Sequence, residues 1–274
     1  MTTIAQACAA VLRESDPRAK VRAARVVARG WRRGALAHEF DVAMPDAPGR
    51  PDRPELLPPN RMPKRGRGGS GKGRIALLHA LAHIEFSAID LAFDAAGRFG
   101  AQFPRAFVDD WISVGADEAM HFAVLDRRLR TLGSGYGALP AHAGLWESAE
   151  ATAHDAMARL AVVPMVLEAR GLDVTPETVA RVRAGGDEPS ACILQRIYTD
   201  EIRHVGFGAK WFGYLAAGHD IEPAQHWQML VRRHFRGVVK PPFNVSARES
   251  AGLTRDFYEP LADMEPVKAQ ADRL

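Results

Sequence analysis

Two short Glu-x-x-His motifs constrain the fold of this chain more than any other feature. They are Glu118 with His121 and Glu201 with His204, and apolar residues at helical spacing surround both. Residues three positions apart on an α-helix share one face, about 5–6 Å apart between Cβ atoms. A buried glutamate is costly unless it is paired or bound to a metal. Each motif therefore predicts a core-facing helix whose carboxylate and imidazole can bind one cation.

A single glutamate precedes each motif by the same interval. Glu85 lies 33 residues before Glu118 (118 − 85 = 33), and Glu168 lies 33 before Glu201 (201 − 168 = 33). Both also lie on apolar stripes at helical spacing. Helical bundles that bind two metal ions use one glutamate from each of two helices and Glu-x-x-His from each of the other two. The chain thus contains two predicted helix pairs, and each pair contributes half of one metal site. The predicted metal ligands are Glu85, Glu118, His121, Glu168, Glu201 and His204.

The hydrophobic periodicity predicts an all-α chain, since strand alternation is nowhere convincing. Asp16 is the predicted N-cap of the second helix with Pro17 at its first position, and Asp187 is a predicted N-cap near the last bundle helix. The third bundle helix is expected to end at Gly171. The predicted helices are 3–14 and 17–33, then the four bundle helices 74–98, 104–132, 143–170 and 188–216, a short one from Thr175–Pro176, one at 222–235 and one after Ser246.

The chain is expected to fall into three regions. Residues 41–73 are rich in proline and glycine and predict a long irregular connection. The regions are 1–73, with N-terminal helices and a basic loop; 74–218, the four-helix bundle; and 219–274, a C-terminal helix and tail packing on the bundle.

The charge distribution is uneven. Residues 17–74 contain 15 Arg or Lys and 5 Asp or Glu, a balance of +10, so the remainder sums to −7 for a net +3. This basic region suggests an anionic partner such as RNA. A solvated arginine-rich helix that balances the chain's own carboxylates explains it equally simply, and we prefer that interpretation.

The remaining composition favours a reduced, cytoplasmic setting. Cys8 and Cys192 are the only cysteines, which gives neither a disulfide framework nor a Cys-x-x-Cys site. We expect no membrane-spanning segment and no signal peptide. Carboxylate and imidazole donors without thiolate suit iron or manganese better than zinc.

Several segments resemble the ferritin-like di-iron superfamily: LAHIEFSAIDLAFD, DEAMHF, VLEARGLD and TDEIRHVGFG. More closely, together with the tail motif PPFNVSARESAGL, they resemble a bacterial ferritin-like family catalogued as a domain of unknown function. The resemblance implies a ferritin-like four-helix bundle with two iron ions, or a manganese–iron pair. It implies Glu118 and Glu201 as bridging ligands and Glu85 and Glu168 as terminal ones.

Further residues are expected to support the ligands. Asp117 and Asp200 each lie four residues before a ligand histidine and could accept its second N–H. The segment Asp200–His204 is similar to the Asp-Glu-x-Arg-His motif of bacterial di-iron monooxygenases, which adds Arg203. Met120 occupies the corresponding position of the first motif.

A second group of residues is expected near the ligands. Tyr198 and Trp111 could be redox-active by resemblance to radical-generating relatives, but ordinary core packing is the simpler interpretation. Pro164 should kink its helix. Phe122 and Phe207 could line a mainly apolar cavity beside Glu168 and Glu201, closed partly by residues 171–187.

The leading hypothesis is an O2-dependent di-iron oxidoreductase acting on a small organic substrate, with O2 as co-substrate and an electron-donor protein as partner. The first alternative is a ferroxidase or iron-handling protein, and the second is a tRNA-modifying hydroxylase. The sequence leaves oligomerisation open.

Overall fold

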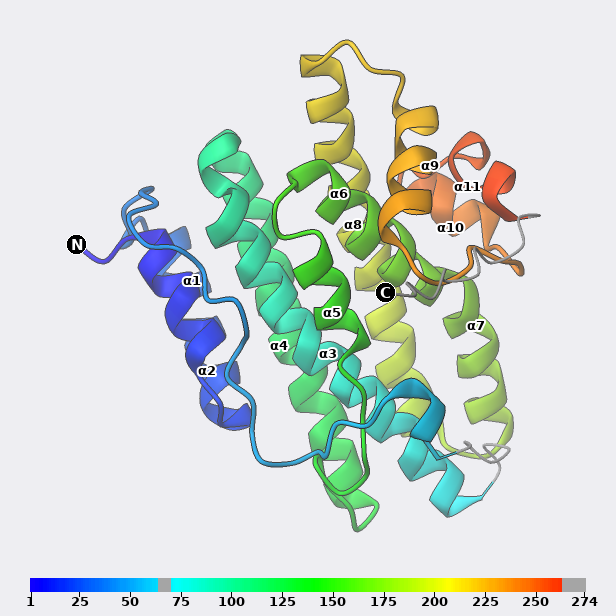
Figure 1. The fold of residues 1–274 in the computed structure, drawn as a ribbon. Coiled ribbons are helices and arrows are strands. Elements are labelled where there is room, and N and C mark those ends of the chain that lie inside the picture. Colours follow the sequence, from blue (N-terminus) through cyan, green and yellow to red (C-terminus); the bar gives the residue numbers. More distant parts are fainter. Residues whose placement is uncertain (64–69, 263–274) are drawn as a thin grey trace, which may run out of the picture. The chain divides into compact units, whose positions relative to one another are not determined.

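The computed structural model describes residues 1–63 and 70–262 of the chain, and Figure 1 shows their fold. Within those ranges every regular element is a helix, and the β-structure consists of the isolated bridges Thr3–Ala37 and Leu56–Ala141. The all-α prediction is confirmed. The helices are α1 (Ile4–Arg13), α2 (Pro17–Arg32), α3 (Gly71–Phe99), α4 (Arg105–Thr131), α5 (Gly144–Ala151), α6 (Ala156–Val162), α7 (Ala169–Ala184), α8 (Glu188–Gly218), α9 (Pro223–His234), α10 (Val245–Ser250) and α11 (Arg255–Ala262), with 3-10 turns Pro59–Arg61 and Gly100–Gln102 and a π-helical turn Val163–Glu168.

The chain divides into two compact units, each built from two separate stretches. The first unit comprises Met1–Glu150 and Glu177–Ile197, and the second comprises Ala151–Pro176 and the chain from Tyr198 onward. Helices α7 and α8 therefore each contribute residues to both units. The three contiguous regions expected from the sequence stay a prediction, since they divide the chain by a different criterion.

The core of the first unit is the pair α3 and α4. Gly115 of α4 lies against the Phe93 ring of α3, where an added Cβ would be 2.5 Å from Phe93 Cε2. The absence of a side chain at this position lets the two helices approach closely. Among the described helices, the segment Gly71–Gln102 is long and apolar enough to cross a membrane, but 67% of its most apolar window is buried in the protein. Such burial is typical of a core helix.

A buried ion pair fastens α2 to α3. Lys20 and Asp90 are fully buried, and the Lys20 Nζ donates to Asp90 and to the carbonyl oxygen of Gly49 at 3.2 Å. Arg50 adds a second contact to Asp90 at 3.0 Å. Burial lowers the pKa of Lys20 and raises that of Asp90, although the attraction between them opposes both shifts. Sequence patterns gave no sign of this pair.

The predicted N-caps Asp16 and Asp187 are confirmed, because their carboxylates accept from Ala19 N and Ser190 N.

The predicted helix at 143–170 is wrong, since α5 ends at Ala151 and a new helix, α6, begins at Ala156. Asp155 causes the second start, because its carboxylate accepts from the N–H groups of Met157 and Ala158.

The predicted helix end at Gly171 and the separate helix from Thr175–Pro176 are also wrong. Helix α7 continues through both positions to Ala184. Pro176 has no N–H to donate to the carbonyl of Leu172, four residues earlier. The side chain of Asn244 donates to that carbonyl instead, at 3.1 Å. A residue far along the chain thus makes the internal proline tolerable.

The tail motif packs within the second unit. Asn244 also caps α10, and Arg248 of that helix donates to both carboxylate oxygens of Asp173 at 2.8 and 2.7 Å. The Arg248 guanidinium lies over the rings of Phe243 and Tyr258. The prediction of a helix at 222–235 is confirmed by α9, and two helices, α10 and α11, occupy the segment where one was expected after Ser246.

Candidate metal site

Three of the predicted ligands converge in the core of the first unit. Glu85 lies on α3, and Glu118 and His121 lie one turn apart on α4; their residues are 4%, 1% and 0% exposed. His121 Nδ1 lies 3.2 Å from Glu85 Oε2 and 3.3 Å from Glu118 Oε2. Each residue offers one ligand atom within 4.8 Å of the others. We call these three residues the first half-site, and they could hold a metal ion.

The electrostatics of the first half-site follow from its two carboxylates. Burial alone would lower the pKa of His121, because it disfavours the charged imidazolium. The hydrogen bonds and negative charges of Glu118 and Glu85 outweigh burial and raise this pKa to about 11. Without a metal, His121 is therefore protonated, and its positive charge is shared by the two carboxylates.

The other three predicted ligands belong to the second unit, and we call them the second half-site. Glu201 and His204 lie one turn apart on α8, with His204 Nδ1 3.7 Å from Glu201 Oε1. His204 is fully buried and Glu201 is half-buried. Glu168 is the last residue of the π-helical turn. The sequence therefore repeats the same donor set in each unit, and convergence of all six residues stays a prediction.

A π-helical turn lies at Pro164, the position where a kink was expected. The turn runs over Val163–Glu168, so it places the wider backbone spiral directly at the predicted ligand. Gly208 of α8 faces Pro164, where an added Cβ would be 2.6 Å from the proline ring. π-Helical turns are frequent at functional sites.

The residues expected to support the ligands lie in different environments. Asp200 is buried, Asp117 is half-buried and Arg203 is exposed. Their predicted hydrogen bonds to ligand histidines stay predictions.

Most of the aromatic residues expected near the ligands pack against other side chains of the core. Trp111 is buried against Phe107, with ring centroids 6.1 Å apart. The Tyr198 hydroxyl accepts from Asn244 Nδ2 at 3.0 Å, which favours the packing interpretation. Phe207 is half-buried, and Phe122 is buried against Phe86 and Tyr136, with ring centroids 5.2 and 5.0 Å away.

Sequence reasoning missed a polar cluster beside this aromatic packing. His83 Nε2 donates to the carbonyl oxygen of His142 at 3.1 Å, so its Nδ1 carries no proton and accepts from the Tyr136 hydroxyl at 2.9 Å. Burial lowers the pKa of His83 to about 4. His83 and His79 both bind protein groups. No local signal pairs His83 with Tyr136, because 53 residues separate them.

The fold and these side chains define an all-helical protein with a buried carboxylate–imidazole cluster that could hold a metal ion. The chain belongs to the family described as "Protein of unknown function (DUF455)", which matches residues 13–259. It is similar to an uncharacterized protein of Haemophilus influenzae, with 40% identity over 221 residues that cover 78% of this chain and 76% of that protein. No solved structure matches the chain significantly.

Proposed function

We propose that this protein is an O2-dependent di-iron oxidoreductase of ferritin-like type that acts on a small organic substrate. The observation that carries the proposal is the buried convergence of Glu85, Glu118 and His121 in the first unit. The second unit supplies the same donors in the same order, from Glu168, Glu201 and His204. Paired sets of this kind are the ligands of two-metal bundle sites.

The chemistry of the donors fits a divalent metal. Buried carboxylates are stabilised when they are paired with positive charge, and in the metal-free first half-site that charge is a proton on His121. A divalent ion between the two carboxylates would replace this proton and bind the freed imidazole nitrogen. Oxygen and nitrogen donors without thiolate favour iron or manganese.

The bound metal pair would supply the chemistry of O2 reduction and substrate oxidation. The residues of the chain would hold and shield it. Phe86 and Phe122 each directly follow a ligand in the sequence, are buried, and pack together with ring centroids 5.2 Å apart. We propose that Asp117 and Asp200 orient the ligand histidines and that an electron-donor protein reduces the metals.

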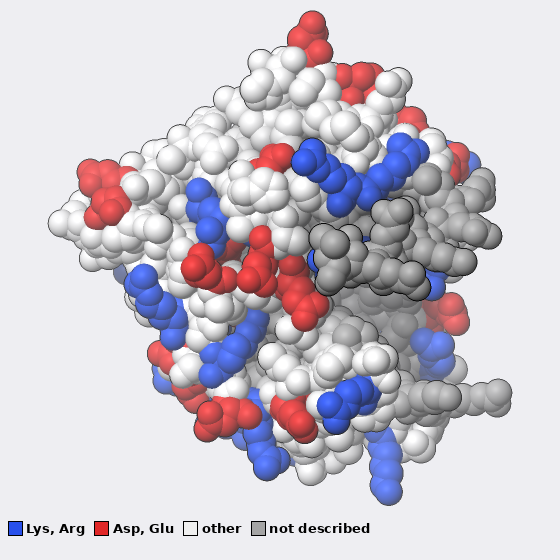
Figure 2. Space-filling model, viewed as in Figure 1, with Lys and Arg blue, Asp and Glu red and all other residues white. Residues whose placement is uncertain are grey.

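A row of arginines supports a second candidate, a hydroxylase that modifies RNA. Four arginines of α2 line a surface hollow of about 450 Å³ together with Ala116 of α4: Arg22, Arg25, Arg29 and Arg32. Such a row could contact phosphates. The face drawn in Figure 2 carries acidic and basic side chains intermixed, so its described residues present no continuous basic surface there. Loss of salt-dependent RNA binding in Arg25→Glu would support this candidate.

Iron titration under controlled O2 separates the enzyme from an iron handler. Metal-free protein receives increasing ferrous iron anaerobically, then O2, and bound iron and consumed O2 are counted per chain. The enzyme binds two irons and stops, whereas an iron handler oxidises and retains many. Glu118→Gln should lose iron, and Glu147→Gln, an exposed position on α5, is the matched control. Accumulation of many irons per chain would contradict the proposal.

A further inference from the structure

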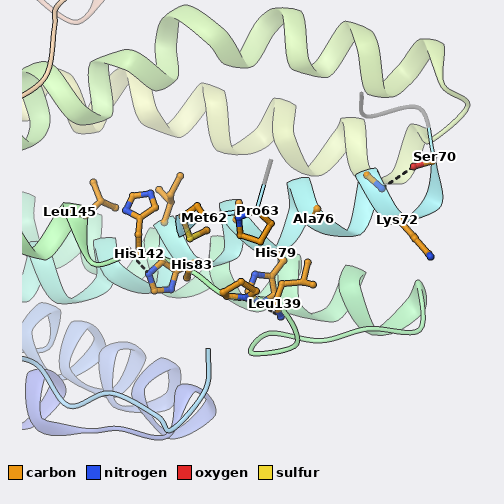
Figure 3. A pocket seen from close by; sticks show the side chains of 15 residues that line it. Met62, Pro63, Ser70, Lys72, Ala76, His79, His83, Leu139, His142 and Leu145 are labelled. Carbon is orange, nitrogen blue, oxygen red and sulfur yellow. Dashed lines mark hydrogen bonds between the residues drawn. The ribbon is translucent and has the colours of Figure 1, made fainter. Parts of the chain in front are cut away.

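A cavity of about 580 Å³ follows α3 within the first unit, as Figure 3 shows. This volume falls in the range of about 300–1,000 Å³ that is usual for small-molecule sites. Its wall is formed by one side of α3, by the segment 139–145 and by Met62 and Pro63. Lys72 lies at the end nearest the start of α3, and Leu145 lies at the opposite end in Figure 3.

The shape and surface of the cavity suit an elongated apolar molecule. Its lining spans α3 from Lys72 to Ile84, a separation of twelve positions, which at a rise of 1.5 Å each is about 18 Å. Most of the lining is apolar: Met62, Pro63, Ala76, Ala80, Ile84, Leu139, Pro140 and Leu145. Ile84 is 42% exposed although it lies on the core helix. A large apolar side chain left open in such a cavity is a natural contact for an apolar ligand.

The histidines of the cavity are already engaged with the protein. His79 Nε2 accepts from the backbone N–H groups of Gly137 at 3.0 Å and Leu139 at 3.4 Å. Both ring nitrogens of His83 are hydrogen-bonded to Tyr136 and His142. These rings therefore form neutral walls and hold the segment 136–142 against α3. They do not make the cavity a cation site.

The charge of the lining residues determines which head group the ligand can carry. Among the described lining residues Lys72 is the one with a full charge, and none is an aspartate or glutamate. Lys72 also lies in the first turn of the 29-residue helix α3, whose N-terminal end carries a partial positive charge. An anionic group is therefore favoured at this end and a cationic one is disfavoured.

We propose that this cavity binds an amphipathic carboxylate, with its hydrocarbon chain along α3 and its carboxylate at Lys72. Glu85 directly follows Ile84, so the bound chain would pass within one turn of the first half-site. Binding itself needs no metal. Ligand binding is therefore measured both on metal-free and on ferrous-loaded protein. If the metal proposal fails, binding to the metal-free protein still tests the cavity.

Calorimetric titration with three ligands of equal chain length tests the proposal. Decanoate, decanol and decylamine each have ten carbons and differ in their head group, and all are used below their solubility limits or micelle-forming concentrations. We expect saturable binding of one decanoate per chain, at least about tenfold tighter than decylamine, which corresponds to 1.4 kcal/mol. Decanol should lie between them. Absence of saturable binding, or equal affinity for decanoate and decylamine, would overturn the proposal.

Two pairs of variants locate the site. Ala80→Trp fills the cavity and should weaken decanoate binding at least about tenfold, while Ala101→Trp, at an exposed position, should leave it unchanged. Lys72→Glu should reverse the preference from decanoate to decylamine. Arg29→Glu makes the same change of charge on α2 and should preserve it. Circular dichroism verifies folding, and unaltered binding by a folded Ala80→Trp protein would refute the location.

Discussion

The buried pair of Lys20 and Asp90 allows the docking of α2 on α3 to be tested quantitatively. Removing one partner of a buried ion pair costs about 3–5 kcal/mol, because the other charge stays buried and uncompensated. In Lys20→Met, Asp90 keeps Arg50 at 3.0 Å, so we expect the lower end, about 3 kcal/mol. In Asp90→Leu, Lys20 keeps the Gly49 carbonyl at 3.2 Å and can lose its proton, which again gives about 3 kcal/mol.

The double variant Lys20→Met/Asp90→Leu should behave differently. It replaces both charges by apolar groups, and such exchanges are often neutral or stabilising. We therefore expect a total cost below about 2 kcal/mol and a coupling of at least about 4 kcal/mol between the two sites. Urea unfolding followed by circular dichroism measures all three variants. Arg255→Met removes an exposed ion pair with Glu259 and should cost less than about 1 kcal/mol. Single costs below 1 kcal/mol, or costs that simply add, would refute the reasoning.

Three further predictions concern the two half-sites and the cavity. His121→Ala or His204→Ala should each abolish binding of at least one metal ion while the helical content persists; elemental analysis and circular dichroism check this, and complete unfolding would make the site structural. His83 has a folded pKa of about 4 against 6.5, so the unfolded state binds more protons between these values and stability is lost as pH falls from about 6.5 to about 4. The loss is about 3 kcal/mol at most, and it should be absent from the pH series of unfolding free energies of His83→Gln. Gly208→Ala should destabilise the protein by about 1–3 kcal/mol in urea unfolding, because its Cβ would overlap Pro164; unchanged stability would contradict the packing at the π-helical turn.

The sequence predicted those features that local chemistry determines. Asp16 and Pro17 mark a helix start because both act within one turn. Glu118 and His121 come together because three residues of helix separate them. The side chain of Glu85 could be assigned to the same cluster because its spacing and apolar neighbours repeat those of Glu168. These inferences required no knowledge of tertiary contacts.

Features that depend on distant partners could not be predicted. Helix α7 continues through Pro176 because Asn244, which lies 72 residues after Leu172, donates a hydrogen bond to the Leu172 carbonyl in place of the missing N–H. Lys20 is buried because Asp90, 70 residues later, offsets its charge. Neither partner leaves a signature in the local periodicity. The cavity along α3 likewise depends on the segment 139–145, which packs against α3 from more than 50 residues away.

The most direct test of the central claim is a crystal structure of the iron-loaded protein with anomalous diffraction measured at the iron edge. We expect two iron peaks per chain, about 3.5–4 Å apart. Both half-sites should supply their ligands: Glu85, Glu118, His121, Glu168, Glu201 and His204. A single peak, no peak, or any of the four glutamates directed to solvent would contradict the account.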